Sequence, residues 1–382
     1  MRTAPRQGDR VDTASASRSA ASPARLWFVD NLRVLLTVLV VLHHIATTYS
    51  GLPLWYYTER PSSAAVGLGL NVFLLLNQAW FMGAFFLLSG CFTPGSYDRK
   101  GPRAFVRDRL IRLGIPLAVF YFVVNPILYV PAYSGGSPIE FYLHTIGSGP
   151  LWFVLALLVF DLCYAGFRQL TANRPARPHS QRAPGYRAVF GFALALALVT
   201  YALRIVVPMG FYVPIIGFPT SAYLPEYVGF FVLGIIAHRR GWLSAITTRM
   251  GWVGLGMAIG ATLVFLPLSL AGGLSGFSGG GTVSSLFYAL WDSTFAVGLV
   301  LALVTFFRSR LNSQGPLRRY LSNNAFTVYV VHAFLVTAAG YALSALDVST
   351  LVKVLIAAVV VVPACWLLAG PVRRLPGVRR VL

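Results

Sequence analysis

The stretch VDNLRVLLTVLVVLHHIATTYSG, residues 29–51, decides the fold class of this chain. An α-helix needs about 20 consecutive, mostly apolar residues to cross the hydrocarbon core of a bilayer. Here a run of Leu and Val extends from an Asp-x-x-Arg start to a His-His pair near its far end. This length and composition predict a membrane-spanning helix rather than the core helix of a soluble domain.

Further stretches of the same kind follow along the rest of the chain. We expect ten spans, at about residues 28–49, 65–91, 110–131, 150–168, 188–208, 221–238, 251–271, 283–307, 321–343 and 350–371. The 382 residues are 57% hydrophobic and 11% charged, whereas a soluble domain carries about 25% charged residues. The predicted fold is therefore an all-α, polytopic membrane helical bundle of about ten transmembrane helices. The second and eighth spans are long enough to be tilted or broken.

The basic residues indicate how this bundle is oriented. The chain holds 31 Lys and Arg against 11 Asp and Glu, a formal net charge of +20. If the spans alternate in direction, 27 of the 31 basic residues fall on one side. Because basic loops stay in the cytoplasm, both termini are predicted to be cytoplasmic. A nucleic-acid-binding protein would instead gather its excess charge on one soluble face, so nucleic acid is not an expected partner.

The two ends of the chain are predicted to be tails. Residues 1–25 are rich in Arg, Ser and Ala without periodicity, which predicts a disordered basic cytoplasmic tail. The apolar run behind it exceeds the 7–15 residues of a signal-peptide core, although a targeting peptide is the alternative. Residues 26–372 then form the transmembrane domain and residues 373–382 a short basic tail. The three cysteines have no metal or redox spacing, so we expect no metal site.

Ionisable side chains in the first span mark two polar positions, because such groups are costly in lipid. Asp30 and Arg33 lie three residues apart on one helical face and are predicted to pair and orient the span. His44 follows about 21 Å further along the helix axis, too far to contact Asp30. Its imidazole suits a general base or a satisfied polar group. His43 points about 100° away and is not expected to share that task.

Basic and acidic side chains recur in the later spans. Arg109 and Arg112 also share a helical face, where two guanidiniums would suit a phosphate, whereas an ordinary cytoplasmic anchor is the alternative. Arg204 and Glu226 lie on spans joined by a short loop and are predicted to pair, or Arg204 binds an anionic acceptor. Deeper ionisable residues are Asp161, Asp292 and His332.

Three motifs in this order resemble the acyltransferase 3 family of integral membrane acyltransferases. The first is Asp30-x-x-Arg33 with His44 at the end of the same helix. The second is FFLLSGCF, residues 85–92, in which Cys91 replaces the usual aromatic residue. The third is Arg-x-x-Arg leading into Leu-Gly-Ile-Pro, residues 109–116. The resemblance extends from about residue 26 to the last span.

Weaker similarities surround Trp152, Glu226 and His332. They look more like the glucan succinyltransferase branch than the branch with a fused extracytoplasmic hydrolase-like domain.

The resemblance implies a membrane-bound O-acyltransferase of a bacterial cytoplasmic membrane. It would move an acyl group, acetyl or succinyl, from cytoplasmic acyl-CoA to a hydroxyl of a glycan or other acceptor on the outer side or in the membrane. Acyl-CoA would be a co-substrate, with no permanently bound cofactor. His44 would be the general base, and Arg109 with Arg112 would bind the donor phosphates.

The remaining candidates receive supporting roles under this resemblance. Asp30, Arg33 and Asp292 would support or orient the site, with Asp292 or Glu226 orienting the histidine. Arg204, Glu226 and Trp152 would lie on the acceptor side. His332 would be a second proton carrier or a helix–helix hydrogen bond.

Two other function classes fit a polytopic bundle with buried charges. A transporter or exporter of a small solute or lipid-linked sugar would use the intramembrane charges for transport. The two halves of the chain show no evident repeat, although transporters are often built from repeats. A membrane scaffold would leave the intramembrane charges unexplained.

Overall fold

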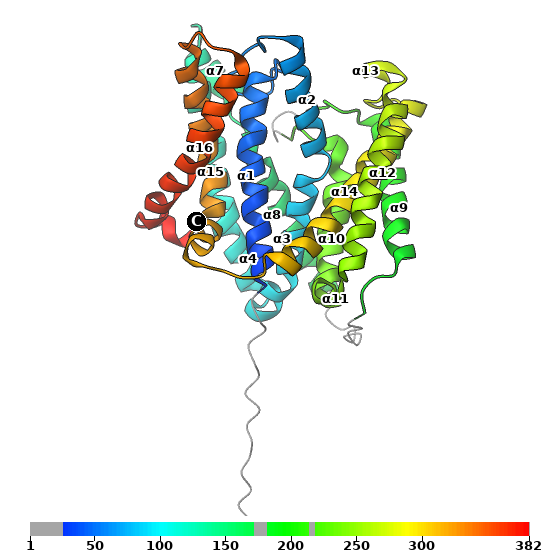
Figure 1. Ribbon diagram of the computed structural model, residues 1–382. Coiled ribbons are helices and arrows are strands. Elements are labelled where there is room, and N and C mark those ends of the chain that lie inside the picture. The colour runs from blue at the N-terminus through cyan, green and yellow to red at the C-terminus, as the bar shows by residue number, and fades with distance from the viewer. Residues whose placement is uncertain (1–25, 172–181, 214–217, 382) are drawn as a thin grey trace, which may run out of the picture.

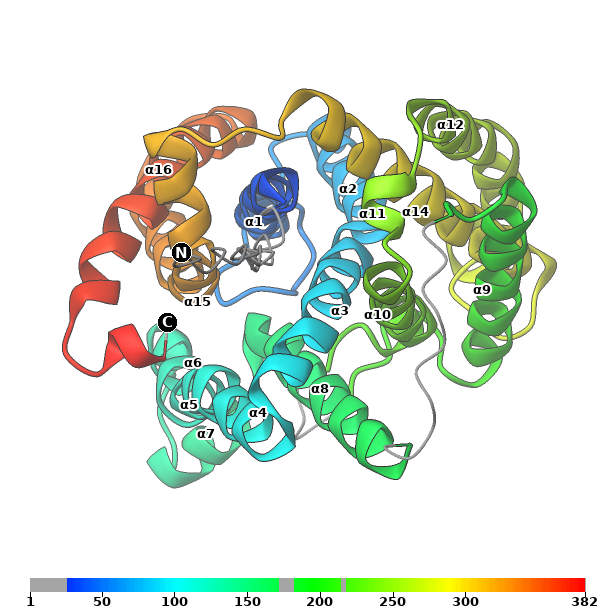
Figure 2. The same cartoon turned by 90° about the horizontal axis from the view of Figure 1, so that it is seen from below.

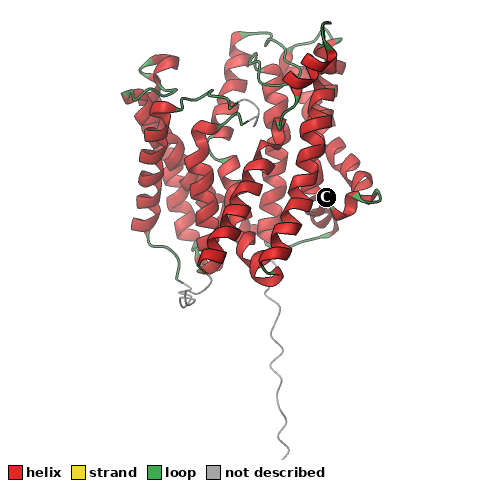
Figure 3. Ribbon diagram, turned by 180° about the vertical axis from the view of Figure 1, so that it is seen from behind, coloured by secondary structure: helices red, strands yellow, loops and turns green. Residues whose placement is uncertain are grey.

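The computed structural model describes residues 26–171, 182–213 and 218–381. Figures 1 and 3 show helices joined by loops in this part of the chain, which holds no β-strand beyond one isolated bridge between Val213 and Phe218. The predicted tail of residues 1–25 lies outside the described residues. The all-α prediction is confirmed.

The helices of the described chain are α1 (Trp27–Tyr49), α2 (Ala64–Gln78), α3 (Phe81–Lys100), α4 (Pro102–Arg109), α5 (Ile115–Val119), α6 (Asn125–Tyr129), α7 (Pro138–Thr145), α8 (Trp152–Leu170), α9 (Tyr186–Val206), α10 (Leu224–Arg239), α11 (Trp242–Ala245), α12 (Thr248–Leu270), α13 (Gly273–Gly276), α14 (Val283–Arg310), α15 (Pro316–Ser344) and α16 (Thr350–Arg374). Short π- and 3₁₀-turns extend or join them: η1 (Leu110–Gly114), η2 (Phe120–Val124), η3 (Val130–Ala132), η4 (Gly149–Leu151), η5 (Ser221–Tyr223) and η6 (Val378–Arg380).

Ten helical segments of the described chain are long and apolar enough to cross a membrane, which confirms the predicted number. The second of them is broken between α2 and α3, at Ala79 and Trp80. The third runs without interruption from Pro102 to Ala132 and contains the π-turns η1 and η2. Helix α7 is an additional short helix that the sequence did not predict, since its eight residues are too few to span a bilayer.

Small residues let the spans approach closely, as is typical of helices packed in membranes. A Cβ on Gly90 of α3 would lie 2.2 Å from the carbonyl oxygen of Phe231 on α10. A Cβ on Gly254 of α12 would lie 2.6 Å from the carbonyl oxygen of Gly298 on α14, which shows a similar restriction in return. These two helix pairs are therefore held at backbone contact distance.

Helix α1 occupies the middle of the bundle. It contacts α2, α3, α14, α15 and α16, and Figure 2 shows it surrounded by these helices in the view along the bundle. Helices α9, α12 and α14 form a group at one edge (Figure 2). The polar residues of α1 consequently face other helices rather than lipid.

Candidate active site

His44, near the C-terminal end of α1, contacts a second histidine on α15. Its Nδ1 lies 3.0 Å from Nε2 of His332, although 288 residues separate the two in the sequence. His332 is fully buried, whereas His44 retains partial exposure. The structure thus shows the helix–helix hydrogen bond that was one of the two predicted roles of His332.

A backbone carbonyl assigns the protons on this histidine pair. His332 Nδ1 lies 2.7 Å from the carbonyl oxygen of Tyr329, which can only accept, so Nδ1 carries a hydrogen. In the neutral imidazole Nε2 is then an acceptor, and His44 Nδ1 must donate to it. His44 Nε2 is left with a free lone pair. The neutral pair therefore presents an unprotonated nitrogen, which is the form that a general base requires.

Helix α15 is fixed at this position by Tyr329. The buried Tyr329 hydroxyl donates a hydrogen bond to the carbonyl oxygen of Pro150, in the turn η4 that precedes α8. One residue thus anchors α15 to α8 through its side chain and holds His332 through its backbone.

The loop between α1 and α2 covers His44 with an aromatic ring. Trp55 stacks on His44 with ring centroids 4.1 Å apart and an interplanar angle of 25°. The loop is tied to α16 by an ion pair of 2.7 Å between Glu59 and Lys353. Ser62 adds two hydrogen bonds to Thr350. These anchors hold the Trp55 ring in place over the imidazole.

Two polar groups of this loop differ in how they are satisfied. The Trp55 Nε1–H is buried and has no hydrogen-bond partner among the described residues. Tyr56 donates its hydroxyl hydrogen to Asn125 Oδ1. Burial, with Tyr129 and Tyr212 nearby, raises the pKa of Tyr56 well above its ordinary value, so this hydroxyl stays neutral. Because a buried N–H without an acceptor is costly, Trp55 is an available donor beside His44.

His43 lies in a different environment, as its angular offset from His44 predicts. Its Nδ1 is 3.2 Å from Asn77 Nδ2, and its ring stacks on Phe81 at 5.1 Å. These partners come from α2 and from the start of α3, where the second span is broken. His43 thus contacts the α2–α3 break, whereas His44 contacts α15.

The two arginines of the third span have separate carboxylate partners. Arg109 Nε lies 2.9 Å from the buried Asp161 of α8. Arg112 Nε lies 3.5 Å from Asp108, and its side chain is 60% exposed. The π-turn η1 begins between the two arginines. Arg109 therefore holds α8, whereas Arg112 is the one that can turn towards a ligand.

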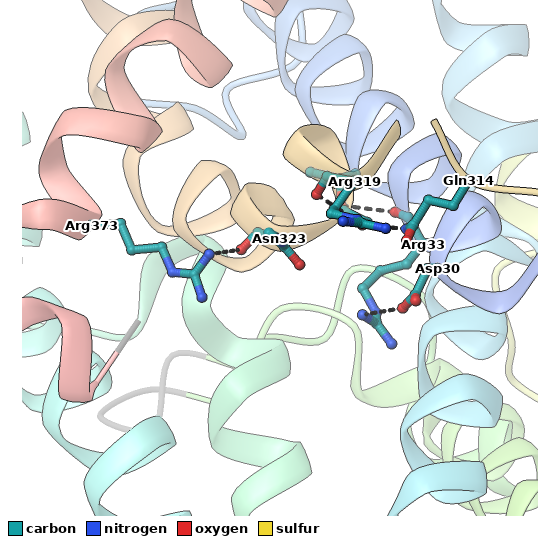
Figure 4. A network of polar contacts seen from close by, with 8 residues as sticks. Asp30, Arg33, Gln314, Arg319, Asn323 and Arg373 are labelled. Atoms are coloured by element: carbon teal, nitrogen blue, oxygen red, sulfur yellow. Dashed lines mark hydrogen bonds and ion pairs between the residues drawn. The ribbon is translucent and has the colours of Figure 1, made fainter. Parts of the chain in front are cut away.

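The predicted pair at the start of α1 is present. Arg33 Nη1 is 3.2 Å from Asp30 Oδ1, as Figure 4 shows. The neighbouring Asn31 donates to the carbonyl oxygens of Leu311 and Ser313. These contacts fix the start of α1 against the segment that leads into α15.

The predicted pairing of Arg204 with Glu226 is wrong. Arg204 Nη2 lies 2.6 Å from Asp292 Oδ2 on α14, and both side chains are fully buried. The rings of Tyr223 and Tyr288 cover the guanidinium at 4.8 and 5.1 Å. Helix α9 packs along α14, which brings these charges together although they are distant in the sequence. Asp292 thus orients Arg204, whereas the side chain hydrogen-bonded to His44 is that of His332.

Glu226 and Trp152 lie near this ion pair without contacting it directly. Buried Glu226 faces Gly83 at the start of α3, where a Cβ would lie 2.2 Å from its Oε1. Trp152 packs on Tyr227 with ring centroids 5.3 Å apart. Tyr227 in turn neighbours Tyr223, which covers Arg204. The three residues predicted on the acceptor side therefore share one aromatic cluster.

A family model described as an acyltransferase domain matches residues 26–370, which is nearly the whole chain. The chain belongs to the acyltransferase 3 family. It is thus a membrane acyltransferase by family, built on ten candidate spans.

Relatives in this acyltransferase family include bacterial proteins named for glucan synthesis. Glucans biosynthesis protein C of Escherichia coli O157:H7 (strain EC4115 / EHEC) is 24% identical over 333 residues, 81% of each chain. The protein of the same name from Escherichia coli (strain K12 / DH10B) is 24% identical over 337 residues, again 81% of each chain. The similarity to the glucan-related branch agrees with the prediction from the sequence.

Sequence reasoning missed Trp55 and the anchors of its loop. The signal was the aromatic run Trp55-Tyr56-Tyr57 in a segment between two spans, where a merely solvated loop would be polar. Lys353 is a charge within the predicted span 350–371, and its ion pair with Glu59 explains it. In the described part of the chain, no group of three or more His, Cys, Asp or Glu side chains is placed to hold a metal ion.

Proposed function

We propose that this protein transfers an acyl group from acyl-CoA to a hydroxyl group, with His44 as the general base. The observation that carries the proposal is the hydrogen-bonded series from the Tyr329 carbonyl through His332 to His44. It leaves an unprotonated Nε2 on the one histidine of the pair that is partly exposed. Membership of an acyltransferase family supplies the reaction class.

The reaction follows from this protonation state. His44 Nε2 removes the proton of the acceptor hydroxyl while the oxygen attacks the thioester carbonyl carbon. The tetrahedral intermediate then collapses, the C–S bond breaks, and the thiolate of CoA takes the proton from the His44 imidazolium. An ester and free CoA result, and His44 returns to its starting form. The base needs no second acid because His332 accepts from Nδ1 throughout.

Trp55 is our candidate for stabilising the negative oxygen of the intermediate. Its Nε1–H is buried without an acceptor, and its ring stacks directly on His44. A donor fixed before the reaction costs no reorganisation when charge develops. The anchors of the loop to α16 keep that donor in position.

The substrates are proposed from the resemblance and the relatives. The donor would be cytoplasmic acetyl-CoA or succinyl-CoA, with Arg112 contacting a phosphate and Arg109 holding the helix through Asp161. The acceptor would be a glycan or another hydroxyl-bearing molecule on the outer side of a bacterial inner membrane, since the relatives are named for glucan synthesis. Both termini would then be cytoplasmic.

The test uses purified protein in nanodiscs with acetyl-CoA, succinyl-CoA and a β-glucan acceptor, and it measures release of free thiol and acylated glucan. The H44A variant should lose about 10²–10⁴-fold in kcat. The matched control is H43A, since His43 is adjacent but contacts Asn77 and Phe81 instead. W55F, which keeps a ring without the N–H, should lower kcat without changing donor KM. Equal activity of H44A and H43A would refute the proposal.

A further inference from the structure

Two adjoining cavities open beside α15 and α16, at the end of the bundle where α1 begins. One, of about 430 Å³, is lined by Tyr320, Asn323, Asn324, Gly370, Arg373, Arg374 and Arg379. The other, of about 360 Å³, is lined by Gln314, Gly315, Pro316, Arg319, Tyr320 and Asn323. We call the two together the α15–α16 pocket. Each is large enough for a small-molecule ligand.

The α15–α16 pocket is lined by arginines and by no acidic residue. Arg373 Nη1 donates to the carbonyl oxygen of Asn323 at 2.7 Å, and so reaches from α16 to α15 (Figure 4). Arg374 and Arg379 are exposed, and the described part of the chain offers neither a hydrogen bond nor an ion pair to them. Guanidinium groups with free donors are suited to phosphate, which they bind in a bidentate manner.

The position of the pocket along α15 fits a thioester donor. Asn324 lines the pocket, and His332 on the same helix contacts His44. Eight residues, or about 12 Å along α15, separate Asn324 from His332. The extended pantetheine arm of CoA, from pyrophosphate to sulfur, is comparable to four residues of extended chain, or about 14 Å. A pyrophosphate held at Asn324 would thus place the thioester beside His44.

We propose that the α15–α16 pocket binds the pyrophosphate of acyl-CoA, with Arg374 and Arg379 as its ligands. This inference rests on the proposed function and extends it, because it adds a binding site that the sequence motifs did not indicate. Arg112 is less well placed for the same group. Arg112 lies thirteen residues before Asn125, or about 20 Å along the third span. Asn125 accepts a hydrogen bond from Tyr56, the residue next to Trp55. Arg112 remains available for the more distant 3′-phosphate.

The experiment compares wild type with R374Q/R379Q in nanodiscs of zwitterionic lipid. Calorimetry measures Kd for acetyl-CoA, for its 3′-dephospho form and for S-acetylpantetheine. The matched control is R187Q/R249Q, which removes two exposed arginines that lie outside the pocket. Thermal unfolding checks that each variant is folded. We expect R374Q/R379Q to raise Kd about 10–100-fold for both CoA forms and to leave S-acetylpantetheine binding unchanged.

Several results would overturn the inference. Unchanged acetyl-CoA binding by R374Q/R379Q would do so, as would a loss confined to the form that carries the 3′-phosphate. If the variant instead lost only binding of spin-labelled phosphatidylglycerol, the pocket would hold a lipid phosphate. Wild-type protein that is folded but binds none of the three thioesters would refute the proposed function itself. If wild type binds the thioesters and R374Q/R379Q binds them equally well, only the assignment of the α15–α16 pocket is refuted.

Discussion

The histidine pair makes a prediction that separates hydrogen bonding from packing. H332L fills much of the space of the imidazole but offers no acceptor to His44 Nδ1, whereas H332Q can place an amide oxygen near the former Nε2 position. In H332L the partly buried Nδ1–H of His44 loses its acceptor on His332 at 3.0 Å. An unsatisfied buried donor costs about 1–3 kcal/mol, which corresponds to a loss in kcat of about 5–150-fold.

The assay measures kcat and donor KM for wild type, H332L and H332Q at the same acceptor concentration. We expect H332L to lose kcat within that range with unchanged KM, because His332 acts through His44 and does not touch the donor. H332Q should recover activity to within about threefold of wild type, since the acceptor is restored. Thermal unfolding in detergent accounts for any general loss of structure.

Three outcomes would refute this reasoning. If H332L keeps wild-type kcat, the proton on His44 Nδ1 does not need an acceptor. If H332Q is as impaired as H332L, the role of His332 is shape rather than hydrogen bonding. A loss in H332L as large as that in H44A would assign His332 a direct chemical step.

Two further predictions concern stability. D292A leaves the fully buried Arg204 charge unpaired and should lower the free energy of unfolding by about 3–5 kcal/mol. D98A removes a carboxylate that is 39% exposed and pairs with Arg239 and Arg168, and should cost about 1 kcal/mol. Equal losses in denaturant melts would contradict the assignment. G254A should force α12 and α14 apart and cost about 1–3 kcal/mol. G260A on the same helix meets open space and should stay within about 0.5 kcal/mol, so matching melting temperatures would refute the close approach at Gly254.

The number of spans could be predicted from the sequence because the requirement is local. Each span must bury its backbone polar groups internally and present apolar side chains to lipid, and both conditions are met within about 20 residues. The Asp30–Arg33 pair was predictable for the same reason, since three residues of one helix set its geometry. The break between α2 and α3 was one of the two outcomes, tilted or broken, that the length of the second span predicted.

The partners of the buried groups could not be predicted, because they depend on how helices from distant parts of the chain pack. His44 and His332 meet only through the contact of α1 with α15. Arg204 had two acidic candidates, and the packing of α9 on α14 selected Asp292. Trp55 lies outside every span and carries no charge, so the cost of intramembrane charge does not point to it.

Burial and exposure separate the two polar clusters of this bundle by role. The ion pair of Arg204 and Asp292 is fully buried and covered by Tyr223 and Tyr288, so no ligand reaches it without displacing aromatic rings. His44 is also hydrogen-bonded across helices, but it keeps exposed surface and one unprotonated nitrogen. A polar side chain that serves stability alone is expected to be paired and fully buried, because an unpaired charge inside the bundle is costly. The exposed face of His44 is therefore better explained by chemistry than by packing.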